Sequence, residues 1–411
     1  MKNKQSFYII LGNLVYLAAQ WGLTVVVVRF SDDYYMAGLL ALATTITSVF
    51  FVVAIYGLRS FQVSDITKKY ADQSYILSRV LTMGVAFVAC AVYVLALGYD
   101  AVSFRVVMLY MLYKSFEAAS DVFYGIFQNN DRFDRICTSM CVKGILSVLV
   151  FAACLALGSS LEIALCAMLA VAALTFFFLD VRWGLQYARP LVHWTREAWG
   201  SAIRLLWAAA LMLVLHLAPP LLMSIPRLYF EHHYTTELLG VYAALATPTA
   251  VISTFVTCAM MPYLPLFARY YYAGDKKGLT RLTVGSMLFT ACFGALALLA
   301  GSWLGEWGLA QLYGDSIRAY AHVFLLVIVV TTLSAATMCL NALFIALRKF
   351  TSISIALALS CLLCQLITPY FVNTYGMEGI TYALMGALGF QVLTGIGLAT
   401  WYIRKTPAPT A

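Results

Sequence analysis

Charged and polar residues form a stripe within one strongly apolar stretch of the sequence. Lys114, Glu117 and Asp121 lie in KSFEAASD (114–121), between the apolar runs RVVMLYMLY and VFYGIFQ. A helix turns by about 100° per residue, so these charges fall within an arc of roughly 80°. The full stripe consists of Tyr110, Lys114, Glu117, Asp121, Tyr124 and Gln128. A cation and two acids on one face can form ion pairs, bind a small cation or bind an anion.

An apolar helix can keep such charges only if they avoid lipid. Each charge at the centre of a membrane costs about 2.5–3.5 kcal/mol, so the stripe must face protein or water. In one interpretation, Lys114 pairs with Glu117 one turn away, and Asp121 pairs with a basic residue of another helix. In the other, the stripe lines a polar translocation path and binds substrate or a coupling ion. Both hold if the ion pair breaks during a transport cycle.

His216 is a further candidate residue inside an apolar run. It begins the sequence HLAPP, in which Pro219 and Pro220 are expected to break the helix and free backbone carbonyls. A single histidine at such a place is also typical of a helix–helix hydrogen bond.

Motifs of soluble enzymes are missing from the sequence. Asp32 and Asp33 resemble the start of a prenyl-diphosphate motif but lack its third aspartate, and we find no phosphate-binding glycine loop, H-E-x-x-H motif or nucleophile elbow. The ten cysteines have no histidine or acid near them at ligand spacing. We therefore expect no enzymatic activity, no cofactor and no metal site.

The composition identifies the elements that must position these residues. Of 411 residues, 63% are hydrophobic and 11% are charged, and the mean hydropathy is +0.87. A soluble protein has about a quarter of its residues charged. The chain is therefore an integral membrane protein, and we interpret its apolar start as a retained first span rather than a signal peptide.

Windows of about 20 apolar residues predict twelve membrane helices. They are 5–28, 34–58, 80–99, 106–127, 140–159, 162–179, 205–225, 238–261, 283–304, 319–347, 351–372 and 379–402.

Lysine and arginine lie overwhelmingly on one side of these predicted spans. Only Arg29, Arg105, Arg227 and Arg318 fall on the opposite side, and Lys114 lies within a span. The imbalance predicts that both termini are cytoplasmic. It also accounts for the net charge of +8 without a nucleic-acid partner.

The chain is expected to divide into two lobes of six spans each. The segment 181–204 is rich in Trp, Tyr and Arg, as is typical of an interfacial connection. We place spans 1–6 in an N-terminal lobe, residues 1–190, and spans 7–12 in a C-terminal lobe, residues 191–411. This arrangement favours a transporter with a site at the midline.

Two stretches resemble a known family. YGLRSFQVSDITKKY (56–70) and YKSFEAASDVFYGIFQNNDRFDRI (113–136) are similar to signature regions of the polysaccharide transporters. These are Wzx-type flippases of the multidrug/oligosaccharidyl-lipid/polysaccharide exporter (MOP) superfamily. The resemblance is clearest over residues 1–200. It implies an all-α, MATE-like membrane fold of about twelve helices in two lobes around a central cavity.

The resemblance also implies a function. The cargo would be an undecaprenyl-diphosphate-linked oligosaccharide, moved from the inner to the outer leaflet of a bacterial cytoplasmic membrane by a monomer. The product would serve surface polysaccharide synthesis, such as lipopolysaccharide O-antigen or capsule.

A diphosphate requires cations, which assigns possible roles to residues near the path. The candidate substrate-binding residues are Lys114, Arg59, Arg29, Arg204 and His216; for the three arginines, anchoring of helix ends is an equally good explanation. Glu117 and Asp121 could take up H⁺ or Na⁺, or simply hold Lys114. The sequence does not require ion coupling, since an anion moving outward gains about 2.3 kcal/mol per charge per 100 mV.

The main alternative is a cation-coupled multidrug exporter of the same fold. Such exporters typically carry an acid in the first span, where this chain has only Asn13 and Gln20 as polar residues of interest. A major-facilitator carrier would have a Gly- and Arg-rich loop after span two, and a membrane glycan ligase would have a large outer loop. The sequence shows neither feature.

Overall fold

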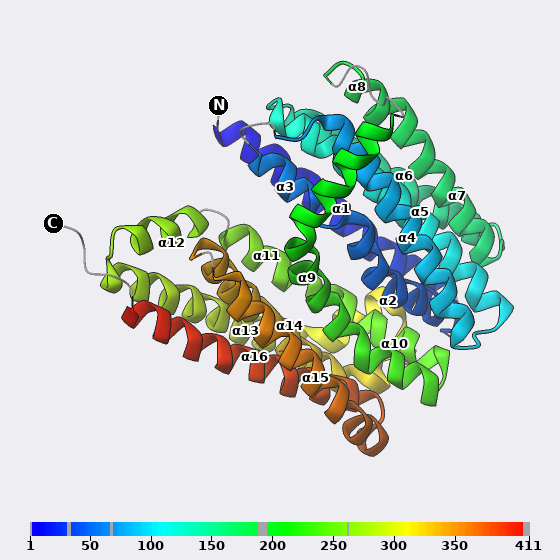
Figure 1. Ribbon diagram of the computed structural model, residues 1–411. Helices are drawn as coiled ribbons and strands as arrows, with labels where there is room; N and C mark the ends of the chain where they lie inside the picture. The colour runs from blue at the N-terminus through cyan, green and yellow to red at the C-terminus, as the bar shows by residue number, and fades with distance from the viewer. Residues whose placement is uncertain are drawn as a thin grey trace. The chain divides into compact units, whose positions relative to one another are not determined.

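A computed structural model describes residues 2–30, 34–65, 69–187, 195–260, 263–347 and 349–405, and these ranges contain helices but no β-strand. By length and composition, ten helices or helical stretches can cross a membrane. The other two predicted spans lie in α5 (Ala101–Asn129) and α9 (Arg196–His233), which are 29 and 38 residues long. The predicted all-α membrane fold is confirmed (Figure 1).

Two compact units make up the chain, Met1–Pro220 and Leu221–Ala411. The limit between them lies inside α9. The division into six-span lobes at residue 190 stays a prediction.

The first unit is built around α5. It comprises α1 (Lys2–Arg29), α2 (Tyr35–Ile55), α3 (Leu58–Ser64), α4 (Asp72–Ala96), α5, α6 (Phe133–Ala156), α7 (Leu161–Thr175), η1 (Phe176–Val181), α8 (Arg182–Gly184) and the start of α9. Helix α5 contacts α2, α3, α4, α6, α7, α8 and η1, while α1 packs along α6. A helix with charges near its middle is thereby surrounded by protein.

Local sequence signals set the ends of the helices in this unit. Helix α4 is followed by Gly98 at φ 73°, and α6 by Gly158 at φ 75°, a backbone conformation that glycine adopts without strain. The next helix then starts on a capping side chain. Asp100 accepts hydrogen bonds from the backbone N–H groups of Val102 and Ser103, and Ser160 accepts one from Ile163.

Two expectations about helix limits are wrong. Helix α4 begins at Asp72, so Arg79 is a buried helix residue rather than a loop charge just before the predicted span 80–99. Helix α6 begins at Phe133, so Lys143 is buried well inside a helix rather than near the start of the predicted span 140–159. Both predicted spans begin too late because charged residues lower the local hydropathy. Helix α9 also runs through Pro219 and Pro220 without a break. Each proline removes one N–H donor, and the helical hydrogen bonds on both sides persist.

The second unit is organised around α14 (Ala321–Ala346). Its other helices are α10 (Thr236–Ala246), η2 (Thr247–Thr249), α11 (Ala250–Met260), α12 (Tyr263–Tyr272), α13 (Lys276–Tyr313), η3 (Asp315–Tyr320), α15 (Phe350–Tyr375) and α16 (Met377–Lys405). Helix α14 contacts α10, α11, α12, α13, α15 and α16. Helices α15 and α16 form a hairpin that turns at Gly376, whose φ is 58°.

Candidate functional site

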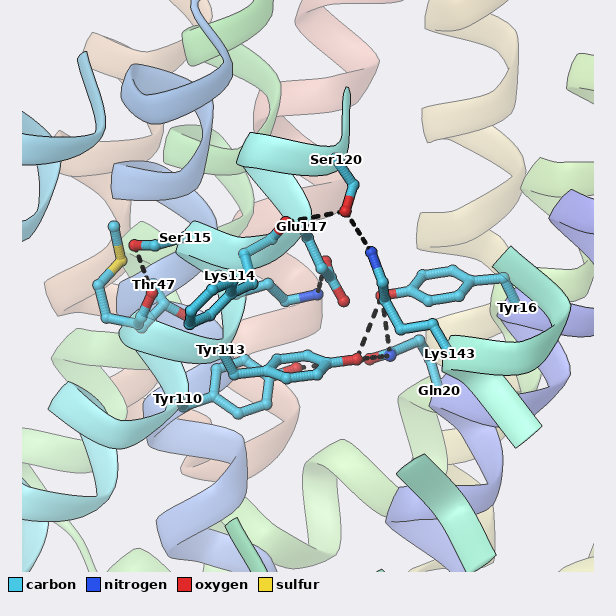
Figure 2. Close-up of polar contacts among 12 residues, drawn as sticks. Tyr16, Gln20, Thr47, Tyr110, Tyr113, Lys114, Ser115, Glu117, Ser120 and Lys143 are labelled. Atoms are coloured by element: carbon cyan, nitrogen blue, oxygen red, sulfur yellow. Dashed lines mark hydrogen bonds and ion pairs between the residues drawn. The ribbon is translucent and has the colours of Figure 1, made fainter. Parts of the chain in front are cut away.

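The polar stripe of α5 carries a buried ion pair. Nζ of Lys114 donates to Oε2 of Glu117 at 2.8 Å, one turn along the same helix (Figure 2). Aromatic rings surround the ammonium group, with the ring centres of Phe51, Tyr110 and Tyr113 at 5.4–5.5 Å. These distances suit cation–π attraction, which helps to compensate for the loss of water around the cation.

Asp121, one turn further, lies between two arginines from other helices. Nη2 of Arg79, on α4, donates to Oδ2 of Asp121 at 2.7 Å. Nη1 of Arg59, on α3, lies 3.6 Å from Oδ1. Arg79 also donates to the carbonyl oxygen of Ala54 at 2.7 Å, close to the end of α2. This arrangement joins α2, α3 and α4 to the stripe of α5.

A second buried lysine approaches α5 from α6. Nζ of Lys143 donates to Oγ of Ser120 at 2.5 Å and lies 3.8 Å from Oδ2 of Asp180 (Figure 2 shows the contact with Ser120). Asp180 belongs to η1, a π-helical segment that continues α7. Such segments are rare in proteins and occur frequently at functional sites.

Hydroxyl and amide groups extend this polar region toward α1. The Tyr113 hydroxyl accepts from Nε2 of Gln20 at 3.2 Å and lies 3.4 Å from the Tyr16 hydroxyl (Figure 2). Nε2 of Gln20 also donates to Tyr16 at 3.1 Å, and the Tyr110 hydroxyl donates to Oε1 of Gln20 at 3.4 Å. Gln20, one of the two polar residues of interest in span one, thus belongs to the same region as the stripe.

The charged residues differ in how far their side chains are exposed. Arg79, Lys143 and Asp180 are at most 2% exposed and contact their neighbours from inside the protein. The side chains that a ligand can reach are 10–30% exposed, namely those of Lys114, Glu117, Arg59 and Asp121. With every group ionised, four cations face three acids. An anion can therefore bind by replacing a carboxylate at an accessible cation.

Two acids of the cluster keep unused acceptors. Oε1 of Glu117 and both carboxylate oxygens of Asp180 are buried and have no hydrogen-bond partner in the part of the chain that the structure describes. A buried acceptor in this state is costly and can be satisfied by a proton or by a ligand.

The structure brings together four of the residues predicted from the sequence, namely Lys114, Glu117, Asp121 and Arg59. The other three predicted residues, Arg29, Arg204 and His216, are exposed. His216 makes a hydrogen bond of 2.8 Å between its Nδ1 and the carbonyl oxygen of Met212, within its own helix. The assignment of Arg29, Arg204 and His216 to substrate binding stays a prediction.

Sequence reasoning missed three members of the cluster. Arg79 and Lys143 were counted with the charges of loops and helix ends, and Asp180 ends the apolar run LTFFFLD without an obvious partner. The available signal was the helical phase, because both basic residues stay in register with the apolar helix that follows them. Among the described residues, no three His, Cys, Asp or Glu side chains gather in a way that could hold a metal ion.

Comparison with known proteins supports this architecture. No family model matches the sequence. The chain is 24% identical over 407 residues to the capsular polysaccharide biosynthesis protein CapF of Staphylococcus aureus, covering 96% of this chain and 97% of the relative.

Solved structures with the same fold are more distant in sequence. An outward-facing multidrug resistance MATE family transporter of the MOP superfamily superposes with a TM-score of 0.64 at 13% identity, covering 98% of this chain and 94% of that one. A MOP superfamily transporter from Pyrococcus furiosus, described as having a binding pocket of reversed polarity, gives a TM-score of 0.58 at 14% identity, with 97% and 94% covered.

These findings agree with the resemblance seen in the two sequence stretches. The chain is a multi-pass membrane protein with the fold of the MOP superfamily transporters, and its similarity to the polysaccharide branch of that superfamily is confirmed.

Proposed function

We propose that the protein is a flippase for undecaprenyl-diphosphate-linked oligosaccharides. It moves them from the inner to the outer leaflet of a bacterial cytoplasmic membrane by alternating access, with both termini in the cytoplasm. The observation that carries the proposal is the charged cluster around α5, in which cations outnumber acids. Similarity to a capsular polysaccharide biosynthesis protein over nearly the full length supports this substrate class.

Lys114 and Arg59 are the cations of the cluster that a diphosphate can reach. Their carboxylate partners keep them paired while no substrate is present, which limits the cost of holding a charge inside the membrane. An arriving phosphate replaces Glu117 at Lys114 and Asp121 at Arg59. Arg79 still holds Asp121 after this exchange, so the site keeps its shape.

Glu117 can also link transport to an ion. Uptake of H⁺ or Na⁺ by Glu117, whose Oε1 has no described partner, weakens its attraction for Lys114. Lys114 then becomes available to the substrate. The membrane potential already favours outward movement of an anion by about 2.3 kcal/mol per charge per 100 mV, so the ion adjusts the cycle rather than powering it alone.

The test is flipping of a fluorescent prenyl-diphosphate oligosaccharide in proteoliposomes. We expect the natural protein to flip it and Lys114→Ala to lose at least tenfold in rate while eluting as a folded monomer. Arg105→Ala, which removes a cation from the exposed pair with Glu162, is the matched control and should retain activity. Normal flipping by a folded Lys114→Ala protein would refute the proposed role of Lys114.

A cation-coupled multidrug exporter is the second candidate, because several neighbours in fold are multidrug transporters. A lipophilic cationic dye, offered in the same proteoliposomes, separates the two functions. Dye transport without glycolipid flipping would favour the exporter, and Glu117 and Asp121 would then be the residues to replace.

A further inference from the structure

The second unit contains a groove between α11, α12 and α13, with a volume of about 740 Å³. In Figure 1, α12 lies beside the beginning of α13, near the C-terminal end of α16. Nζ of Lys276 donates to the carbonyl oxygen of Arg404 at 2.9 Å, which places the groove at the same end of the unit as the basic residues of the C-terminus.

Helix α13 gives the groove a polar end and an apolar end. Lys277, Arg281, Gly285 and Phe289 all line it, each four residues after the previous one. Residues at this spacing follow one another along a single helix face. The face therefore passes from two cations, through a glycine, to an aromatic ring.

The opposite wall is mostly apolar and aromatic. Ala259 and Met260 come from α11, and Tyr263 and Tyr270 come from α12. Tyrosines with a polar tip and an apolar body are typical of the boundary between lipid and water.

The two cations of the groove are available to a ligand. Lys277 and Arg281 are both exposed, and neither forms an ion pair with any residue in the described ranges. One acid, Asp275, also lines the groove. Its Oδ1 accepts a hydrogen bond from the backbone N–H of Gly278 at 2.8 Å and caps α13. The lining therefore carries two cations against one acid that already has a structural role.

The groove is open next to the glycine in its middle. A Cβ atom added to Gly285 would meet no heavy atom within 4 Å. A chain of CH₂ groups can lie there and continue along Phe289, which is 39% exposed.

We propose that this groove binds a phosphate-bearing membrane lipid. Lys277 and Arg281 contact the phosphate, and the hydrocarbon chain lies along Gly285 and Phe289. The charge and the apolar length of the groove complement these two parts of such a lipid. The proposal goes beyond the flippase function, because the groove lies in the second unit and uses none of the residues around Lys114. An anionic phospholipid and a prenyl phosphate both combine a phosphate with a hydrocarbon chain in this way.

Native mass spectrometry of the full-length protein in detergent tests this binding. The probes are phosphatidylglycerol, phosphatidylcholine with the same acyl chains, and undecaprenyl phosphate. Attraction of the two cations to the anionic headgroup predicts that phosphatidylglycerol binds at least about tenfold tighter than phosphatidylcholine. The double variant Lys277→Gln/Arg281→Gln should lose this preference. Gly285→Leu should weaken the binding of both phospholipids, because its side chain fills the place of the hydrocarbon chain.

Two variants serve as matched controls. Arg269→Gln/Lys276→Gln removes the same charge from the same end without changing the lining of the groove, and Gly308→Leu alters an equally open glycine of α13. Both variants should bind the three lipids as the natural protein does. The proposal is overturned if phosphatidylglycerol has no advantage in the natural protein, or if the control pair abolishes that advantage as fully as the groove pair.

Comparing the two phosphate lipids identifies the source of the ligand. Tighter binding of undecaprenyl phosphate than of phosphatidylglycerol would support a site for the prenyl carrier, and equal binding would support a general anionic-lipid site. Because the readout is binding, failure here leaves the flipping assay unaffected, and a protein that does not flip can still show this site.

Discussion

Arg79 of α4 and Asp121 of α5 form the shortest ion pair between helices among the described residues of the first unit, with 2.7 Å between Nη2 and Oδ2. Arg79 is 1% exposed and also bonds to the carbonyl oxygen of Ala54. This one side chain connects α2 and α4 to the polar stripe of α5. Its role is to hold Asp121 and, through it, the position of Arg59.

Replacing Arg79 by methionine should therefore destabilise the protein. Asp121 would keep only the longer contact with Arg59, at 3.6 Å. Removing one partner of a buried ion pair costs about 3–5 kcal/mol, because the other charge stays behind. Thermal unfolding in detergent measures the loss. Arg318→Met, in an exposed pair with Glu306, is the control and should unfold near the temperature at which the natural protein unfolds. Equal unfolding temperatures of the two variants would contradict the structural role of Arg79.

Exchanging the charges of Lys114 and Glu117 separates pairing from binding. Lys114→Glu/Glu117→Lys keeps an ion pair at the same spacing but moves the ammonium group by one turn. We expect the double variant to fold and to lose at least tenfold in flipping rate, because the cation no longer lies at the proposed binding position of the phosphate. The same exchange in the exposed pair Asp315 and Arg318, also three residues apart, should leave flipping unchanged. Full activity of the exchanged Lys114 and Glu117 would show that the pair is only structural.

The buried pair of Lys143 and Asp180 should behave as one unit. Lys143→Met or Asp180→Leu alone leaves a buried charge without its partner and should cost about 3–5 kcal/mol. The double variant removes both charges and should recover most of that loss. A double-mutant cycle of thermal unfolding gives the coupling between them. Additive losses in the double variant would mean that the two side chains do not stabilise each other.

Asp100, at the start of α5 and outside the spans, predicts a dependence of stability on pH. Hydrogen bonds from Ser103 and from the backbone N–H groups lower the pKa of Asp100 below its ordinary value of 3.8. A lowered pKa in the folded state means that the cap stabilises fully above this value and is lost as the pH falls through the folded pKa.

Asp100→Ala should accordingly lower the free energy of unfolding by about 0.5–2 kcal/mol at neutral pH and by progressively less in acid. The free energies of unfolding of the natural protein and of this variant are compared between pH 7 and pH 3. Asp100→Asn also caps the helix but does not titrate, so its stability should lack this change. If the free energies of unfolding of the natural protein and Asp100→Ala differ by the same amount at every pH down to 3, the proposed role of the carboxylate is excluded.

The sequence by itself determined the membrane class and the approximate positions of twelve helices, and it offered the pairing within α5 as one of two interpretations. These properties depend on local features, namely the length of apolar runs and the spacing of residues on one helix. Lys114 and Glu117 meet because three residues along a helix bring side chains to one face. The need of Asp121 for a basic partner on another helix also followed from the cost of a lone charge in lipid.

Only the tertiary structure decided which partner that is. Arg79 lies 42 residues from Asp121 in the chain, and no periodicity links them. Lys143 and Asp180 likewise meet because α6 and α7 pack side by side and because a π-helical segment places the acid on the buried face. The apolar windows stopped next to Arg79 and Asp180 and placed Lys143 near the start of a span, whereas packing against other helices can bury a charge once its partner is present.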